Sequence, residues 1–351
     1  MRIRFGPLDP VITDSLVTDV AITVDGRVWT DRGLGMERDP RVPDFRSPRS
    51  VREFAVGLCA QLGSRLDDAC PIADATSSDG IRVNAVIAPV VPDGASVSIR
   101  IQPNTAPGLD DLAARGMMPD SWTVLLRRMV ASRANILIVG ATGSGKTTLM
   151  RALLRECAAG ERVVSVEEVR ELGDIGVDNH VALAVRKANV EGAGEVGMED
   201  LVRASLRMRP DRIVVGECRG SEMAELVRAL NSGHRGGMTT IHANGIEAVA
   251  SRLVALGLLA GMSPQTVAMM AHEAFDVIIH VGRLSGVRRV RGLGRLSCHA
   301  GILSSHSVAW WDPGDASGPR YGPDWGEFSR LCLFADPACA PDDVEEGTSG
   351  C

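Results

Sequence analysis

Apolar and polar positions alternate in short runs through the first part of the chain. The stretches 20–30 and 80–101 alternate as strands do, and Asp25-Gly26 supplies a tight hairpin turn within the first of them. Between them, the apolar residues of the stretch 51–62 fall on one face of a helix. We therefore expect a small α+β domain over residues 1–101.

The apolar pattern changes after a connector at residues 102–119 that contains Pro and Gly. The stretch 122–130 repeats with the spacing of a helix that buries one face. Short, mainly apolar runs then alternate with segments of helical pattern, as expected of strands buried on both faces of a parallel sheet. These runs are 135–139, 163–166 and 213–215. The pattern predicts an α/β domain over residues 120–296.

Residues 297–351 form a segment rich in Gly, Pro, Asp and Ser that carries no recognisable motif. The aromatic stretch 309–325, with its Pro-Gly and Gly-Pro turns, has the composition of a strand that folds back as a hairpin. The stretch 336–351 is an acidic, loose end. We expect a C-terminal extension that is partly disordered.

Composition narrows the class of protein. A chain of 351 residues that is 45% apolar is large enough for two cores. Its 3% aromatic content and formal charge of −6 disfavour a protein that acts mainly on nucleic acid. No run has the roughly 18 to 20 apolar residues of a membrane span, and the eight cysteines include no C-x-x-C pair. We expect a cytoplasmic protein with reduced thiols.

A glycine-rich loop follows the first apolar run of the α/β part and precedes a helical segment. Its sequence fits G-x-x-x-x-G-K-[ST], in which backbone amides and a lysine hold the phosphates of a nucleoside triphosphate and a hydroxyl binds Mg²⁺. A chance glycine-rich turn is the alternative, and the flanking strand and helix disfavour it. Lys146 then contacts the phosphates and Thr147 the metal. The predicted nucleotide-binding residues are Gly140, Ala141, Thr142, Gly143, Ser144, Gly145, Lys146, Thr147 and Thr148.

Two groups of acidic residues follow apolar runs downstream of this loop. Glu217 ends the run 213–215 after one glycine, in the position of an acid that holds Mg²⁺ or polarises the attacking water. Glu167, with Glu168 and Glu171, ends the run 163–166. A solvated strand end or helix start is the alternative for each group. The ends of parallel strands share one crevice, and this order favours a catalytic role for Glu217 and Glu167.

Two histidines flank the pair Thr239-Thr240. His234 and His242 are eight residues apart, which differs from the i, i+4 spacing of two metal ligands on one helix. A buried structural histidine is the alternative for each. Their place beside glycines favours a sensor of the terminal phosphate, in which a neutral ring donates to that phosphate.

Taken together, four stretches in fixed order resemble the secretion ATPases of type II and type IV systems, and most closely the TadA/CpaF-like branch of the tight-adherence (Flp) pilus and conjugal transfer. These stretches are NILIVGATGSGKTTLMRALL, VVSVEEVREL, LVRASLRMRPDRIVVGECRGSEM and LNSGHRGGMTTIHANG. The family calls them the Walker A, Asp, Walker B and His boxes. Stretches before residue 101, such as GPLDPVITDSLVTDVAITVDGRVWTDRG, resemble its N-terminal domain.

The resemblance implies a RecA-like P-loop ATPase domain behind a smaller N-terminal α+β domain, with ATP and Mg²⁺ as cofactors. It implies that Arg82 and Arg100 close over the nucleotide and that Arg207, Arg209 and Arg219 act at or near subunit interfaces. Surface ion pairing is the alternative for each arginine. The Asp box departs from the family pattern, because Glu168 stands where the family usually has Asp.

The resemblance also implies a motor that powers pilus assembly or protein secretion as a ring of six subunits, on a membrane platform made by other proteins. It implies a place at the inner face of the cell membrane. Two alternatives stay open. One is an ATPase for DNA uptake or conjugative DNA transfer, and the other is a nucleotide-gated ring that hydrolyses weakly.

Overall fold

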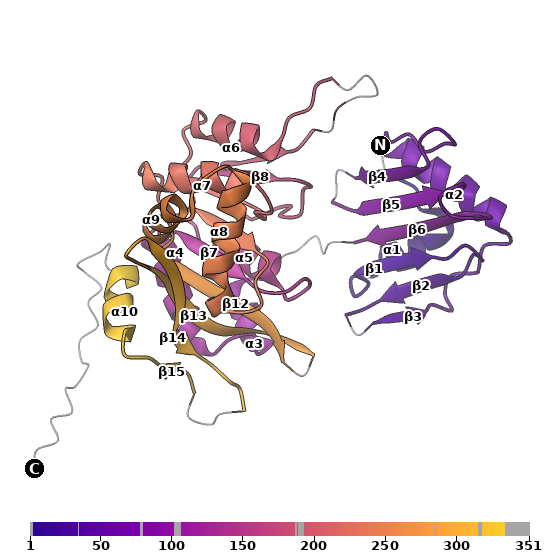
Figure 1. Ribbon diagram of the computed structural model, residues 1–351. Helices are drawn as coiled ribbons and strands as arrows, with labels where there is room; N and C mark the ends of the chain where they lie inside the picture. Colours follow the sequence, from indigo (N-terminus) through magenta and orange to yellow (C-terminus); the bar gives the residue numbers. More distant parts are fainter. Residues whose placement is uncertain are drawn as a thin grey trace, which may run out of the picture. The chain divides into compact units, whose positions relative to one another are not determined.

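The computed structural model describes residues 3–33, 35–77, 80–101, 107–186, 188, 193–284, 286–314 and 318–333 (Figure 1). The chain divides into two units. The first contains Met1–Thr105 with the short segment Val169–Asp174, and the second contains Ala106–Glu168 and Ile175–Cys351. The acidic end predicted for 336–351 lies outside the described residues, as does part of the predicted connector, 102–106.

An antiparallel sheet forms the first unit, with strand order β3-β2-β1-β6-β5-β4. The predicted hairpin at 20–30 is confirmed, because β1 and β2 pair antiparallel. The predicted helix is α2, whose buried residues Val51, Ala55 and Leu58 pack on the sheet and whose first turn is capped by Ser47. The elements are η1 (Gly6–Leu8), α1 (Asp9–Ile12), β1 (Asp19–Ile22), β2 (Val28–Asp31), β3 (Met36–Arg38), α2 (Pro48–Gln61), β4 (Ile72–Thr76), β5 (Arg82–Ile87) and β6 (Ala95–Arg100).

A mixed sheet of order β15-β14-β13-β12-β7-β11-β10-β8-β9 forms the centre of the second unit. The strands from β12 to β9 are parallel, and β13, β14 and β15 extend the sheet antiparallel to one another. All three predicted apolar runs are buried parallel strands. The strands are β7 (Ile136–Val139), β8 (Val163–Glu167), β9 (His180–Ala184), β10 (Arg212–Val215), β11 (Met238–Ile241), β12 (Val277–Leu284), β13 (Val287–His299), β14 (Ile302–Trp310) and β15 (Arg320–Tyr321).

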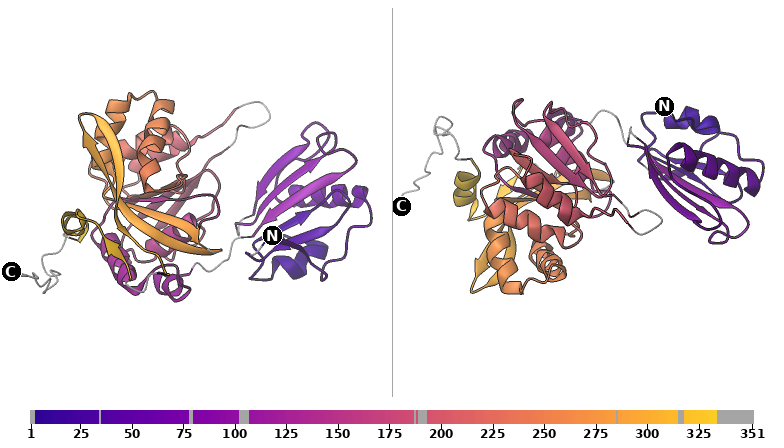
Figure 2. Two further views of the ribbon diagram at one scale, coloured as in Figure 1. Left: turned by 60° about the horizontal axis from the view of Figure 1, so that its bottom comes forward. Right: turned by 90° about the horizontal axis from the view of Figure 1, so that it is seen from above.

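Helices connect successive strands of this sheet and pack on its faces, as expected of a chain that alternates strand and helix (Figure 2). A core on one side joins Leu137, Ile213 and Val215 of the strands to the apolar faces of α6, α7, α8 and α9. The helices are α3 (Leu109–Ala114), α4 (Asp120–Ala131), α5 (Lys146–Leu154), α6 (Met198–Leu206), α7 (Glu222–Asn231), η2 (Ile246–Ala248), α8 (Val249–Leu259), α9 (Pro264–Ala274) and α10 (Trp325–Leu333).

The C-terminal part is more ordered than its composition indicates. Strand β13 runs without interruption through the boundary expected at residue 296, and β14 pairs with it. The fold-back expected in 309–325 is present, since Ala309 pairs with Tyr321 across β14 and β15. Helix α3 likewise lies within the stretch expected to be a connector. Five cysteines of the described part, Cys59, Cys70, Cys157, Cys218 and Cys298, are free thiols, as expected.

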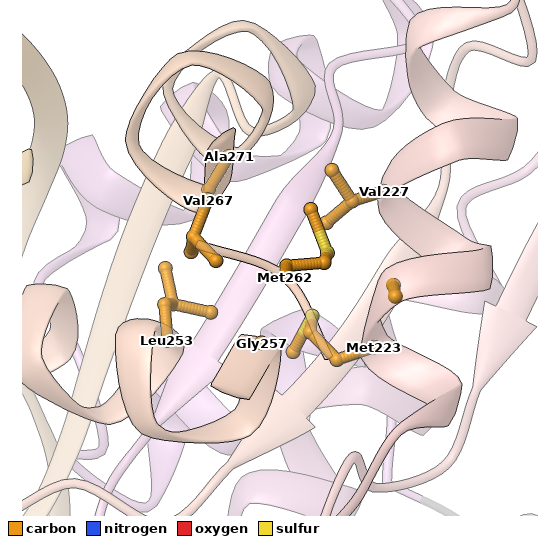
Figure 3. A pocket seen from close by; sticks show the side chains of 8 residues that line it. Met223, Val227, Leu253, Gly257, Met262, Val267 and Ala271 are labelled. Atoms are coloured by element: carbon orange, nitrogen blue, oxygen red, sulfur yellow. The ribbon is translucent and has the colours of Figure 1, made fainter. Parts of the chain in front are cut away.

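A small apolar pocket with a volume of about 10 Å³, enough for the centre of one water-sized sphere to move in, lies among α7, α8 and α9 (Figure 3). Only apolar residues line it: Met223, Ala224, Val227, Leu253, Gly257, Met262, Val267 and Ala271. Gly257 permits the close approach of the helices, because a Cβ there would lie 2.2 Å from a methyl carbon of Val267. In the described part of the chain no single helix has the length and apolar character of a membrane span; Ile246–Leu259 and Pro264–Ala274 meet that test only as a pair bent by 119°.

A buried ion pair holds the amino ends of the central strands. Arg212, only 1% exposed at the start of β10, donates from Nε to Glu161 at 2.7 Å and from Nη2 to the Val130 carbonyl at 2.8 Å. Arg133 donates to the same carboxylate at 2.8 Å. Burial by itself raises the pKa of Glu161, but Arg212 and Arg133 outweigh it and lower that pKa below its ordinary value.

We predict that Glu161→Ala lowers the free energy of unfolding by about 3–5 kcal/mol, because it leaves the buried Arg212 without its carboxylate. Denaturant titration of the full chain measures the change. Glu53→Ala removes a carboxylate whose ion pair with Arg49 is exposed, and it should alter stability by less than about 1 kcal/mol. Equal effects of the two substitutions would contradict the assignment.

Candidate active site at the phosphate loop

Parallel pairing brings the predicted boxes to one edge of the sheet. Val139 at the end of β7 is paired with Ile241 at the end of β11, and Val215 of β10 with Val166 of β8. The residues that follow these ends are Gly140, His242, Glu217 and Glu167. The carboxyl edge of a parallel sheet is where such folds bind ligands, so this edge is the candidate active site.

Two glycines allow the loop its shape. Gly140 has φ of +156°, and a Cβ there would lie 2.1 Å from the carbonyl oxygen of Val281 on the neighbouring strand β12. Gly145 has φ of +105° and is the residue before α5, whose first residue is Lys146. The loop therefore turns tightly between β7 and the amino end of α5, where the helix dipole favours an anion.

Lys146 is held inside the loop. Its side chain is largely buried, and Nζ donates to the carbonyl oxygens of Gly140 at 3.0 Å and Ala141 at 3.1 Å. Nζ also lies 3.4 Å from Nδ1 of His242. An ammonium group can only donate, so Nδ1 accepts and the ring proton is on Nε2.

Glu217 is held at both oxygens. Nε2 of His242 lies 2.5 Å from Oε1, and Nη2 of Arg219 lies 2.7 Å from Oε2. Burial lowers the pKa of His242, and the charge of Lys146 lowers it further, against the opposing effect of Glu217. The imidazole is therefore neutral near neutral pH, with its Nε2 in close contact with Oε1 of Glu217. A continuous chain of contacts links Lys146 to the predicted Walker B acid through His242.

The remaining acids lie on the next strand. Glu167 is only 3% exposed at the end of β8, and a Cβ on Gly216 would lie 3.0 Å from its Cγ, so the strand end of β10 packs directly on it. Glu168 is exposed and lies 3.5 Å from Nη1 of Arg219. Arg219 therefore joins the two acid groups. The hydroxyl of Thr147 and the carboxylates of Glu217 and Glu167 are oxygen donors of the kind that Mg²⁺ prefers, so these residues fit that ion.

Three predicted residues lie at the opposite edge of the sheet. His234 precedes β11, and its Nδ1 lies 3.3 Å from the Ala229 carbonyl at the end of α7. Arg207 and Arg209 are exposed between α6 and the start of β10. Since β11 and β10 each cross the sheet before reaching the phosphate loop, the structure does not bring these three residues to Lys146 within one subunit.

The two arginines of the first unit are neighbours in its sheet. Arg82 on β5 is paired in register with Arg100 on β6. Arg100 donates to Asp19 at 3.0 Å. Arg82 forms an ion pair of 2.6 Å with Glu171 of the segment Val169–Asp174, which belongs to this unit. Both arginines have ion-pair partners here, and their contact with a nucleotide stays a prediction.

The sequence did not predict one contact to the phosphate loop, which is made by Arg288. Arg288, at the start of β13, donates from Nε to the carbonyl oxygen of Gly143 at 3.2 Å. The basic run Arg288-Arg289-Val290-Arg291 was the available signal, but sequence alone does not show which strand lies beside β7. The parallel pairing of β12 with β7 explains the proximity.

The comparison with known families agrees with this geometry. The sequence profile of the family described as "Type II/IV secretion system protein" matches residues 4–281. This chain belongs to that family. The predicted family is thereby confirmed, and the match runs through the first unit and all four boxes.

Relatives of known name cover most of the chain. A putative conjugal transfer protein of Mycobacterium tuberculosis is 38% identical over 88% of this chain and 89% of its own length. The type IV secretion system protein VirB11 of Brucella suis is 30% identical over 88% of this chain and 89% of its own length. Among solved structures, the Legionella pneumophila ATPase DotB is similar with a TM-score of 0.56 and 20% identity, covering 88% of this chain and 82% of that chain. The last likeness supports the fold, and the predicted α/β, RecA-like fold class is confirmed.

We predict that Gly140→Ala lowers the stability of this secretion-family chain by about 2 kcal/mol or more, because the added methyl meets the Val281 carbonyl. It should also weaken nucleotide binding, because the loop must shift. Gly160→Ala is the matched control, since nothing lies within 4 Å of a Cβ there. Thermal unfolding and nucleotide titration of both variants measure these effects; an unaltered Gly140→Ala variant would refute the loop geometry.

Proposed function

We propose that this chain is an ATP-hydrolysing motor of a type II/IV secretion-like apparatus. The observation that carries the proposal is the chain of contacts Lys146–His242–Glu217 at the mouth of the phosphate loop. It joins a phosphate-binding lysine to an acid able to orient water, as hydrolysis of a phosphoanhydride requires. The family match supports the same activity.

The charged side chains of the site compensate one another. The ammonium group of Lys146 rests on two loop carbonyls, and His242 and Arg219 hold Glu217. A bound triphosphate gives Lys146 stronger, charged acceptors in place of neutral carbonyls. Because Lys146 also contacts Nδ1 of His242, its movement alters the ring that holds Glu217. The presence of the terminal phosphate is thereby communicated to the catalytic acid.

The roles of the other residues follow from their donor types. The loop amides and Lys146 bind the β and γ phosphates, and the Thr147 hydroxyl with Glu217 would hold Mg²⁺. When bound, Mg²⁺ offsets the negative charge of the phosphates. Glu217 and Glu167 orient the attacking water through hydrogen bonds to their carboxylates. Loss of the terminal phosphate returns Lys146 to the loop carbonyls.

We propose further that the chain works as a ring, of six subunits by its resemblance, on a membrane platform made by other proteins at the cytoplasmic face. Arg207, Arg209 and His234 precede strands β10 and β11, at the ends of these strands away from the loop, where they are available to a neighbouring subunit in this proposal. An arginine supplied to a neighbour's phosphate stabilises the charge of the transition state. Arg82 and Arg100 close over the nucleotide in this proposal.

We predict that Glu217→Gln retains ATP binding but lowers turnover by at least about 100-fold, because the amide cannot accept a proton from water. Lys146→Ala should lose both ATP binding and turnover. Arg228→Gln, on the exposed side of α7, is the control and should behave as wild type. Phosphate release and nucleotide titration on the full chain measure both properties. Full activity of Lys146→Ala would end the proposal.

A second candidate function is transfer of DNA, and the name of the Mycobacterium tuberculosis relative favours it. The motif resemblance supports the Flp pilus branch, and the acidic charge and the scarce aromatic residues weigh against a nucleic-acid translocase. We predict that single- or double-stranded DNA does not stimulate ATP turnover at physiological salt. Stimulation of about tenfold or more by DNA would instead favour the conjugative function, since substrate-coupled turnover is its direct consequence.

A further inference from the structure

The hairpin of β12 and β13 passes directly beside the phosphate loop. Strand β12 is paired with β7, and the carbonyl of Val281 lies against Gly140 at the base of the loop. Beyond this point the hairpin carries two exposed arginines, Arg283 on β12 and Arg288 on β13, which are direct partners in the register. Neither residue belongs to the four boxes.

Both arginines lie at the outer side of Gly143. Arg288 donates from Nε to the Gly143 carbonyl at 3.2 Å, and its Cδ lies 3.2 Å from the position of a Cβ on Gly145. The Nη2 of Arg283 lies 3.8 Å from the position of a Cβ on Gly143. Arg288 is thus hydrogen-bonded to the loop, and Arg283 lies opposite Arg288 on the neighbouring strand.

A bound anion would stabilise the two positive charges of Arg283 and Arg288. Two like charges directly opposite each other on adjacent strands are destabilising. Over the part of the chain that the structure describes, Arg283 forms no ion pair or hydrogen bond. Arg289, the next residue after Arg288, is used differently: it donates to the Gly116 carbonyl and lies over the ring of Trp311. Contacts within the chain therefore explain why an arginine stands at position 289, but they do not explain the arginine at position 283.

We infer that Arg283 and Arg288 form a second contact to the polyphosphate of the nucleoside triphosphate held by the same loop. This inference rests on the proposed function. Lys146 and the loop amides approach the phosphates from inside the loop, and the arginine pair stands at its exposed outer rim, where Ala141, Thr142 and Gly143 are exposed. A guanidinium group has planar donors suited to phosphate oxygens, and the bound anion removes the repulsion within the pair.

The test uses the full chain and two probes, Mg·ATP and inorganic tripolyphosphate. We expect Arg283→Gln and Arg288→Gln each to weaken the binding of both probes about tenfold, the size of one lost hydrogen bond to a charged group. The melting temperature of Arg283→Gln without ligand should not fall, because removing this charge relieves the repulsion between the two arginines. Arg283→Lys keeps the charge and should retain most of the affinity.

Arg295→Gln is the matched control on β13, because Arg295 pairs with Glu327 away from the loop; its affinity for both probes should match wild type. Three outcomes overturn the inference: unchanged affinity in both Gln variants, weaker binding of ATP but not of tripolyphosphate, or a changed self-association with unchanged affinity, which assigns the pair to a partner. Wild-type protein that binds no ATP would instead overturn the proposed function.

Discussion

The arrangement of the site depends on the hydrogen-bond acceptors that surround one buried cation, the ammonium group of Lys146. Lys146 lies at the first turn of α5 with little access to water, and an ammonium group in that position needs acceptors. Two loop carbonyls and one imidazole nitrogen supply them. The tautomer of His242 follows from this contact, and the other ring nitrogen, Nε2, lies 2.5 Å from Oε1 of Glu217. The lysine therefore organises the side chains around the phosphate loop.

Much of the site was predictable because strand direction and sequence order are enough to place it. A strand that ends in Gly140, Glu217 or His242 in a parallel sheet delivers that residue to the shared carboxyl edge. His234 illustrates the limit. It lies within the same stretch of sequence as His242, but a four-residue strand, roughly 13 Å long at 3.3 Å per residue, separates them. Proximity in a motif does not establish proximity in space.

The parts that sequence reasoning missed depend on pairing between distant strands. Strand β13 is rich in Gly and Arg, and its 13 residues lack a simple apolar alternation, so the boundary expected at 296 fell within it. Its contact with Gly143 arises only because β12 lies next to β7. Arg82 shows the same limit, since its partner Glu171 is distant in sequence. Non-local contacts of this kind leave no periodic signal in the chain.

The division of the chain into units has a mechanical consequence. The polypeptide leaves the second unit after Glu168, contributes Val169–Asp174 to the first, and returns at Ile175. Two peptide bonds separate the buried acid Glu167 from a segment that belongs to the other unit. Tension on that segment reaches the end of β8 along covalent bonds, so the backbone itself connects the smaller unit to the strand end that carries Glu167.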